Sequence, residues 1–308
     1  MALSTTSLAL GESRATCRNN AIPSWGDYVC AFGPGTDPAM DSPEAVENMI
    51  RHWIGRGFTG VYLRTDLAQL DPSMIRRNPV RQPNPRLAGF WHFVDEVMER
   101  FDVHEVAQRL SDKHDFEFWA WHPHLYSDGA PETAGTTGPG RMVPWSYVSA
   151  YTFAHPEAIT VDRKGNKLWM VREYAYPGAR ASKVAEFVHM ARKYGIRRFV
   201  ACMRSEVSQL QDPPDKADQY GFNPPVVDDM KRLYGVDILS DPRFDVDSPS
   251  FDPLNPMVEN WRNLRGGYVT QFFRELRAAL NEVDPKIRIC VPLSGERAGP
   301  PLGNWRLD

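Results

Sequence analysis

The chain has 308 residues, a formal net charge of −3 and four scattered cysteines. Its 42% hydrophobic and 24% charged residues are typical of a globular protein and exclude a disordered chain. The near-neutral charge, without runs of like charge, excludes a nucleic-acid-binding protein that works through a basic face, and no apolar run is long enough for a membrane span. Because no Cys-x-x-Cys pair occurs, the sequence excludes a zinc knuckle or dithiol motif. We also expect no cofactor.

The N-terminal segment differs in character from the rest of the chain. Residues 1–22 are polar and aperiodic, which predicts a flexible arm in front of one domain at 23–308. The first residues lack the basic stretch of an intact signal peptide. A periplasmic or extracellular location would therefore require an N-terminus that is incomplete here.

After the arm, apolar strand-like runs alternate with amphipathic helical segments. The predicted strands are 26–32, 60–65, 116–121, 198–203 and 287–293. The predicted helices are 41–57, 87–114 with a break and new cap at Asp102, 182–194, 225–234 and 261–283. A polar turn at 162–166 between two apolar runs predicts a β-hairpin.

This alternation predicts an α/β fold with parallel β/α units. Five units are visible in the sequence, whereas a closed barrel needs eight. We expect a (β/α)8 TIM-barrel type that is incomplete at its C-terminus; the alternative is an open five-stranded sheet. Because no helix follows the run at 287–293 to cover its edge and faces, we expect residues 1–308 alone to self-associate or dissolve poorly, and the gene to continue with about three more units.

In parallel β/α folds the functional site forms at the carboxyl ends of the strands. The ionisable and aromatic residues at these ends are Arg64, Asp66, Trp121, His122, His124, Arg204, Glu206 and Glu296. Glu206 is a candidate general acid, because burial raises the pKa of a carboxyl group. The competing interpretations are a solvated Glu206 paired with Arg204, and an Asp66 that only caps its loop.

The His122-Pro123-His124 segment also suits a second chemistry. His-x-His on an extended segment puts both rings on one side, as in several metal hydrolases. A third ligand at a recognisable spacing is missing. Two rim histidines that bind neighbouring groups are therefore favoured over a metal site. The sequence also contains no Gly-x-Ser-x-Gly elbow, no P-loop and no dinucleotide fingerprint.

A series of short motifs gives a family resemblance. These are RGFTGVY at 56–62, FAHPE at 153–157, VDRKG at 161–165, YAYPGAR at 174–180, YGFNPPVV at 220–227, YGVD at 234–237 and TQFFRELR at 270–277. In order and spacing the series resembles bacterial glycosyl-hydrolase-like family 10 proteins over roughly residues 25–295. The resemblance implies a (β/α)8 barrel that acts on or binds carbohydrate.

The resemblance also implies roles for the strand-end residues. Related barrel glycosidases often carry the acid/base just after strand 4, which points to Glu206, with Asp66 and Glu296 as secondary carboxylates. Arg64, Trp121, His122, His124 and Arg204 would then bind the oligo- or polysaccharide. Many relatives read Leu-Asp-Phe-x-Arg on strand 4, whereas 201–205 reads ACMRS without an aspartate. A non-catalytic carbohydrate-binding barrel is therefore the first alternative, and a metal-dependent hydrolase that uses His122 and His124 is the second.

Overall fold

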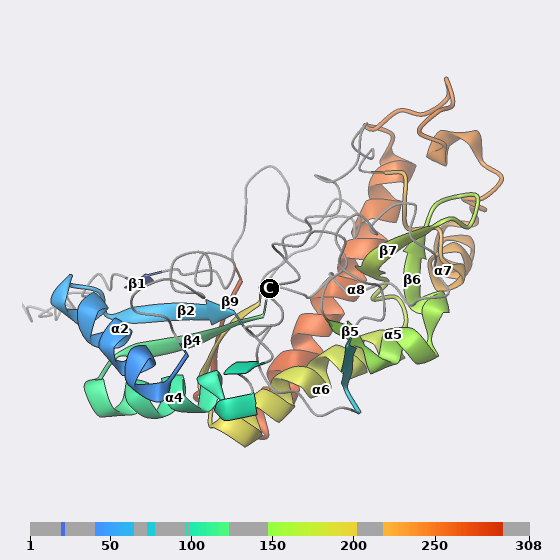
Figure 1. The fold of residues 1–308 in the computed structure, drawn as a ribbon. Helices are drawn as coiled ribbons and strands as arrows, with labels where there is room; N and C mark the ends of the chain where they lie inside the picture. Colours follow the sequence, from blue (N-terminus) through green and yellow to red (C-terminus); the bar gives the residue numbers. More distant parts are fainter. Residues whose placement is uncertain are drawn as a thin grey trace, which may run out of the picture.

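A five-stranded parallel sheet forms the centre of the molecule (Figure 1). The computed structural model describes residues 20–21, 41–64, 73–77, 96–97, 99–122, 147–201 and 218–291. In spatial order the strands are β1 (Asn20–Ala21), β2 (Gly60–Arg64), β4 (Glu117–His122), β8 (Arg198–Ala201) and β9 (Arg288–Cys290). All neighbours pair in parallel, and the spatial order follows the chain order. Consecutive β/α units produce this arrangement.

Four of the expected strands, those at 60–65, 116–121, 198–203 and 287–293, are confirmed by β2, β4, β8 and β9. The expected strand at 26–32 lies outside the described residues. The fold is thus mixed α/β with a parallel sheet, and closure of that sheet into a barrel stays a prediction. The arm at 1–22 and the domain bounds also stay predictions.

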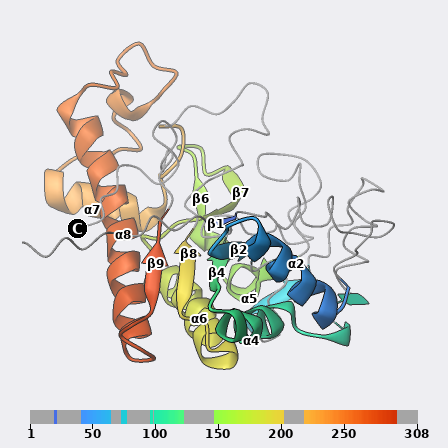
Figure 2. The same ribbon diagram turned by 90° about the vertical axis from the view of Figure 1, so that its left-hand side faces the viewer.

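Four long helices connect the strands and pack on one face of the sheet. They are α2 (Pro43–Gly55), α4 (Val103–His114), α6 (Pro177–Tyr194) and α8 (Pro256–Asn281). The side chains of Ser42 and Asp102 accept backbone N–H groups at the first turns of α2 and α4, as N-caps do. Helices α6 and α8 lie beside each other next to β8 and β9 (Figure 2). Both begin earlier than expected, because a proline occupies the first turn of each.

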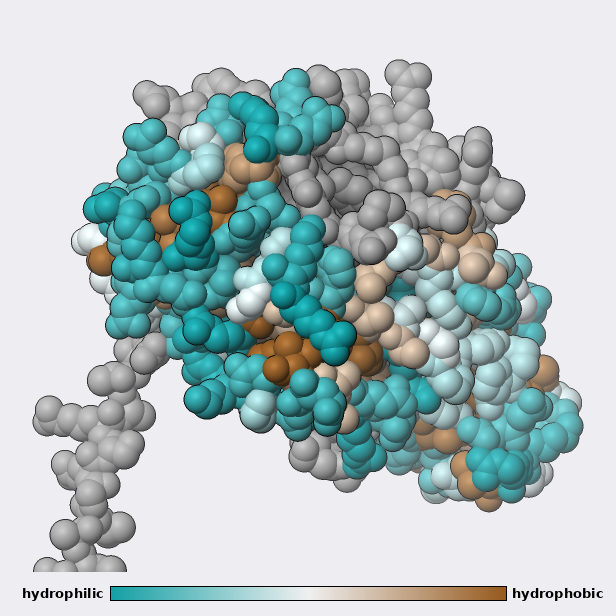
Figure 3. All heavy atoms as spheres, turned by 90° about the horizontal axis from the view of Figure 1, so that it is seen from below, coloured by the Kyte–Doolittle hydropathy of each residue, from teal (hydrophilic) through white to brown (hydrophobic). Residues whose placement is uncertain are grey.

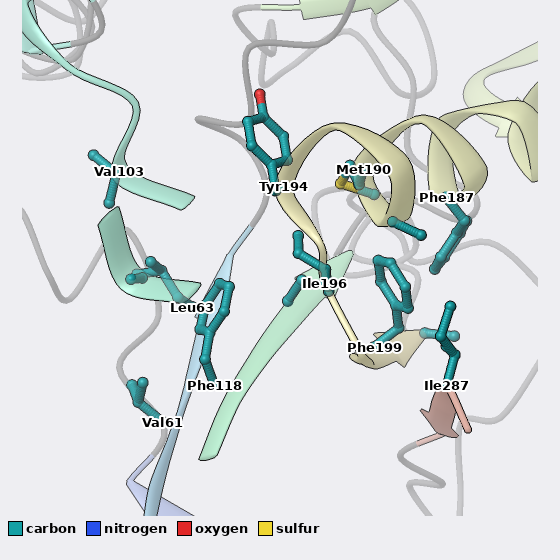
Figure 4. Packing of buried hydrophobic residues seen from close by; sticks show 14 of the residues in the cluster. Val61, Leu63, Val103, Phe118, Phe187, Met190, Tyr194, Ile196, Phe199 and Ile287 are labelled. Atoms are coloured by element: carbon teal, nitrogen blue, oxygen red, sulfur yellow. The ribbon is translucent and has the colours of Figure 1, made fainter. Parts of the chain in front are cut away.

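The main core fills the space between the sheet and these helices (Figure 4). Val61 and Leu63 of β2, Phe118 of β4 and Phe199 of β8 point into it, and Phe187 of α6 packs on Phe199 with ring centroids 5.2 Å apart. Successive strand residues point to opposite faces. The residues between them in the sequence therefore point to the other face of the sheet. Seen from below, the surface carries many hydrophilic residues, and a hydrophobic patch lies among them near the middle of the view (Figure 3).

Two long excursions follow the carboxyl ends of β4 and β8. The first contains β5 (Tyr147–Ser149), which pairs with β3 (Ile75–Arg77), then α5 (Ala150–Ala154), the 3-10 helix η3 (Pro156–Ala158) and an antiparallel hairpin of β6 (Ile159–Val161) and β7 (Lys167–Arg172). The predicted hairpin turn is confirmed. The second contains α7 (Pro224–Tyr234) and η5 (Pro242–Phe244).

The two excursions are joined by Asn223. Its side-chain oxygen accepts the Val161 N–H at 3.0 Å, and its amide group donates to the Ile159 carbonyl at 2.8 Å. A second core forms beside this junction around Trp261, which is fully buried against Phe222 and Phe244. Both excursions therefore form one packed layer. Among the described residues, no helix has the length and apolar character that a membrane crossing requires.

Candidate functional site

Three aromatic rings lie on the face of the sheet opposite the helices. The ring of Tyr62 meets Trp119 edge-on at 5.8 Å and Trp121 edge-on at 6.3 Å between ring centroids. Edge-to-face pairs of this kind favour one ring orientation, so Tyr62 fixes both indoles. Trp119 is buried, whereas Tyr62 and Trp121 are half-buried. Trp121 stands opposite Arg64 in the strand register, at the carboxyl ends of β2 and β4.

The other end of this face is held by ion pairs around Glu117. Its carboxylate accepts Arg288 at 2.6 Å and the indole N–H of Trp119 at 3.1 Å, and it lies 3.5 Å from Arg198. The guanidinium of Arg288 also covers the Trp119 ring at 5.0 Å. Burial acts to raise the pKa of Glu117, but Arg288, Trp119 and Arg198 together lower it. Glu117 is therefore an ionised structural group, and its hydrogen bond with the indole N–H holds Trp119 in place.

A cavity of about 360 Å³ opens beside Glu117 at the amino ends of the strands. Its lining includes the basic residues Arg197, Arg198, Lys286 and Arg288, and three of these form ion pairs with Asp112 or Glu117. In parallel β/α folds this end contributes to stability, and chemistry takes place at the opposite end. We therefore assign the cavity to the support of the sheet and place the candidate site at the carboxyl end of β4.

His122, the neighbour of Trp121, points to the helix side of the sheet. Its Nε2 atom lies 2.9 Å from Oε2 of Glu186 in α6, and its ring packs on Phe187 with centroids 4.7 Å apart. Lys183 donates to the same Glu186 oxygen at 2.7 Å. Arg172 of β7 lies 3.6 Å from the other oxygen and donates to Ser182 at 2.9 Å. This buried charge network joins β4, β7 and α6 just below the carboxyl end of the sheet.

The network keeps its single carboxylate ionised. Burial acts to raise the pKa of Glu186, but the charge of Lys183, the hydrogen bond with His122 and the charge of Arg172 outweigh burial and hold the pKa far below its ordinary value. All four side chains are at most 5% exposed. A charge in such a place is tolerated only when it is paired, so each member depends on the others.

A second buried carboxyl, Glu173, follows β7. It accepts the Ala175 N–H at 3.1 Å and lies 3.4 Å from the Thr160 hydroxyl. Burial raises its pKa, and the charge of Arg265 opposes this without cancelling it. A protonated carboxyl is the chemistry of a general acid, but Glu173 is only 1% exposed. A substrate could not reach so buried a group, so we assign Glu173 a structural role in the packing of the first excursion.

The structure describes only part of the predicted site. Trp121 and His122 are described with their side chains, and Arg64 by its backbone in β2. Trp121 and His122 lie on opposite faces of the sheet, so the structure does not bring these two side chains together. The predicted site residues outside the described residues are Asp66, His124, Arg204, Glu206 and Glu296. Within the described part of the chain, no three His, Cys, Asp or Glu side chains are grouped as a metal site.

Several residues of the candidate site were not singled out from the sequence. Strand alternation could have identified Trp119, because it puts residues 117, 119 and 121 of β4 on one face. The same alternation in β2 could have identified Tyr62. Lys183 and Glu186 lie three residues apart on the buried face of α6, beside Phe187. Charged residues at core-facing helix positions are a signal of a buried ion pair.

No protein-family model and no curated protein matches this chain. Among solved structures, the chain is similar to the structure of the PgaB (BpsB) glycoside hydrolase domain from Bordetella bronchiseptica, with a TM-score of 0.50 and 13% sequence identity. The similarity covers 90% of this chain, which spans 65% of that chain. At this identity the likeness concerns the fold. Membership in glycosyl-hydrolase-like family 10 stays a prediction.

Proposed function

We propose that this chain is a glycoside-hydrolase-like protein that acts on an oligo- or polysaccharide at the carboxyl ends of its parallel strands. The observation that carries the proposal is the half-buried Trp121, held edge-on by Tyr62 at the end of β4. A fixed indole of this kind offers an apolar face to the C–H face of a sugar ring, while sugar hydroxyls need polar groups around it. The fold likeness to a glycoside hydrolase domain supports the same substrate class.

The proposal includes a barrel of the (β/α)8 type. Parallel strands that follow one another in both sequence and space, each with its helix on the same face, are the front part of such a barrel. In that geometry the face with Tyr62 and Trp121 would be the inside of the barrel. The motifs that resemble glycosyl-hydrolase-like family 10 support the same architecture.

For the chemistry, we assign the acid/base role to Glu206, which follows β8. In glycoside hydrolysis a protonated carboxyl gives its proton to the glycosidic oxygen as the C–O bond breaks, and a second carboxylate either activates water or attacks the anomeric carbon. Asp66 and Glu296, after β2 and β9, are the proposed second carboxylates. Arg64, His124 and Arg204 would bind sugar hydroxyls. Water supplies the incoming atoms, so no cofactor is needed.

A non-catalytic carbohydrate-binding protein is the second candidate. It is favoured by the segment 201–205, which lacks the aspartate that many relatives carry on strand 4. In that case Trp121 and the polar rim would bind the same ligand without bond cleavage.

Hydrolysis of a panel of oligo- and polysaccharides, followed as released reducing ends, tests the proposal. We expect activity in the wild type and a loss of about 10²- to 10⁴-fold in Glu206→Gln, because general acid catalysis is worth that much. Glu282→Gln, at an exposed helix end, is the matched control. Glycan binding without hydrolysis would select the second candidate, and absence of both would refute the carbohydrate proposal.

A further inference from the structure

The two indoles of β4 differ in how their N–H groups are satisfied. Trp119 and Trp121 lie two residues apart on the same face of the sheet, and Tyr62 meets both rings edge-on. Nε1 of Trp119 donates to the Glu117 carboxylate at 3.1 Å. Nε1 of Trp121 is also a buried atom, but within the part of the chain that the structure describes it has no hydrogen-bond partner. The fold therefore satisfies one indole donor of this pair and leaves the other unmet.

The residue types around Trp121 in the sheet explain why its donor is unmet. In the strand register Trp121 stands between Arg64 of β2 and Val200 of β8. An arginine side chain carries only N–H donors, and a valine side chain is apolar, so neither type can accept a hydrogen bond. Two residues before Trp119 stands the carboxylate of Glu117, whereas two residues before Trp121 stands the indole of Trp119. These positions thus supply an acceptor for Trp119 and none for Trp121.

An unmet buried donor at this place points to a ligand. Folded proteins satisfy nearly all buried donors, and each exception calls for an explanation. The buried indole of Trp261 follows the rule, because its N–H donates to the Gly221 carbonyl at 3.2 Å. Trp121 differs in lying at the carboxyl end of its strand, where the functional site of a parallel β/α fold forms. Since an indole N–H only donates, the ligand atom that meets it must be an acceptor, such as a sugar oxygen.

The direction of the N–H bond decides which part of a carbohydrate it reaches. The N–H bond lies in the plane of the indole, whereas a sugar ring that stacks on the indole lies above that plane. Because a hydrogen bond is strong only when it is nearly straight, a stacked sugar unit cannot accept from Nε1 of Trp121. The acceptor must lie at the edge of the ring. In an oligosaccharide, the unit that follows or precedes the stacked one reaches this edge.

We propose that Trp121 binds two consecutive units of an oligosaccharide. One unit lies on the face of the indole, and the neighbouring unit accepts a hydrogen bond from Nε1 through a hydroxyl or ring oxygen. Nε1 is covered in the free protein, so the stacked unit first brings its neighbour to the edge of the ring, and the groups at this edge then move aside. Trp121 thereby favours chains of sugar units over single units. The inference rests on the proposed function, because it assumes a carbohydrate at Trp121.

The first test follows the indole N–H signals by NMR in the whole 308-residue chain with ¹⁵N-labelled tryptophan. The probes are hexasaccharides of glucose, xylose, mannose and N-acetylglucosamine. The nine tryptophans give nine indole signals, and Trp121→Phe and Trp119→Phe identify two of them by their loss. We expect the Trp121 proton to move downfield when a hexasaccharide binds, because its N–H gains an acceptor. The Trp119 proton should keep its position, because its N–H is already bound to Glu117.

The second test removes the donor and keeps the ring. Benzothienylalanine, in which sulfur replaces the indole N–H, is incorporated in place of Trp121, and in place of Trp261 as the matched control. We expect the variant at position 121 to bind the hexasaccharide about tenfold more weakly and the matching monosaccharide as the wild type does. Its melting temperature should not fall, because no hydrogen bond within the fold is lost. The control loses the bond to Gly221, so it should melt at a lower temperature and bind the hexasaccharide normally.

Three results would overturn the inference. They are an unmoved Trp121 signal in the bound wild type, unchanged hexasaccharide affinity in the variant at position 121, and an equal loss of affinity for the monosaccharide. In each case a loss of affinity in Trp121→Ala would leave the proposed function standing. A wild type that binds none of the hexasaccharides would overturn both.

Discussion

Nε2 of His122 and Oε2 of Glu186 lie 2.9 Å apart although the residues are 64 positions apart in the chain. The contact joins the last residue of β4 to the middle of α6 and is closed from the other sides by Lys183 and Arg172. Trp121, the preceding residue, points the other way and packs on Tyr62. The end of β4 is therefore held by the buried ion pairs on the helix face of the sheet and by aromatic contacts on the opposite face.

The stability of this end of the sheet depends on Glu186. Glu186→Gln leaves Lys183 and Arg172 buried without their carboxylate, and removal of one partner from a buried pair costs about 3–5 kcal/mol. We expect a loss of that size in the free energy of unfolding, measured by urea denaturation. The matched control, Glu282→Gln at an exposed helix end, should change stability by less than about 0.5 kcal/mol. Equal stability of the two variants would contradict the network.

The two buried glutamates should respond to pH with opposite signs. The pKa of Glu186 in the folded protein lies below its ordinary value of 4.5. Its stabilising contribution is therefore complete above pH 4.5 and is lost as the pH falls below it. The pKa of Glu173 lies above the same ordinary value, so its contribution is complete below pH 4.5 and is lost as the pH rises.

Urea denaturation between about pH 3.5 and pH 7.5 tests this pair of signs. The stability difference between the wild type and Glu186→Gln should shrink toward the acidic end. Relative to the wild type, Glu173→Gln should gain stability toward the neutral end. If the stability difference from the wild type changed with pH in the same direction for both variants, one of the two carboxyl groups would not have the pKa shift described here.

Gly221 occupies a position that no other residue fits. Its φ is +106°, and a Cβ atom there would overlap the guanidinium of Arg265. Arg265 is itself buried and lies over the Trp261 ring at 4.8 Å, so the added methyl group would force a buried side chain to move. Gly221→Ala should destabilise the fold by about 1–3 kcal/mol. Gly267→Ala in α8 meets no atom within 4 Å and should stabilise by about 0.5–1 kcal/mol. Thermal or urea unfolding compares the two.

Trp121 should contribute to binding more than to folding. Trp121→Phe keeps an aromatic ring near Tyr62 but reduces the surface offered to a sugar. We expect a loss of glycan affinity of about tenfold, with a larger loss in Trp121→Ala. Tyr234→Ala, which removes an aromatic ring that is 39% exposed at the end of α7, is the control and should bind as the wild type does. Unchanged affinity in Trp121→Ala would exclude this ring from the ligand site.

The elements of the fold are largely readable from the sequence, because they depend on local pattern. The apolar runs predict β2, β4, β8 and β9, and the polar turn at 162–166 predicts the β6–β7 hairpin. The start of α6 is missed because 177–181 carries few apolar residues, although Pro177 is a typical first helical residue.

The buried polar contacts are not readable in the same way, because they join distant segments. Nothing local in His122 identifies Glu186 as its partner, and a histidine at the end of a strand fits a site equally well. The alternation of β4 does predict that Trp121 and His122 point to opposite faces. If the two-residue alternation of strands is applied to β2 and β4, it groups Trp121 with Trp119 and Tyr62 on one face.

The proposed function requires that a carbohydrate binds at the carboxyl end of the parallel sheet. A crystal structure of the wild type with a bound oligosaccharide of the preferred polysaccharide tests it directly. We expect a sugar ring against Trp121. An oligosaccharide held instead in the cavity beside Glu117 and Arg288, at the amino ends of the strands, would contradict it.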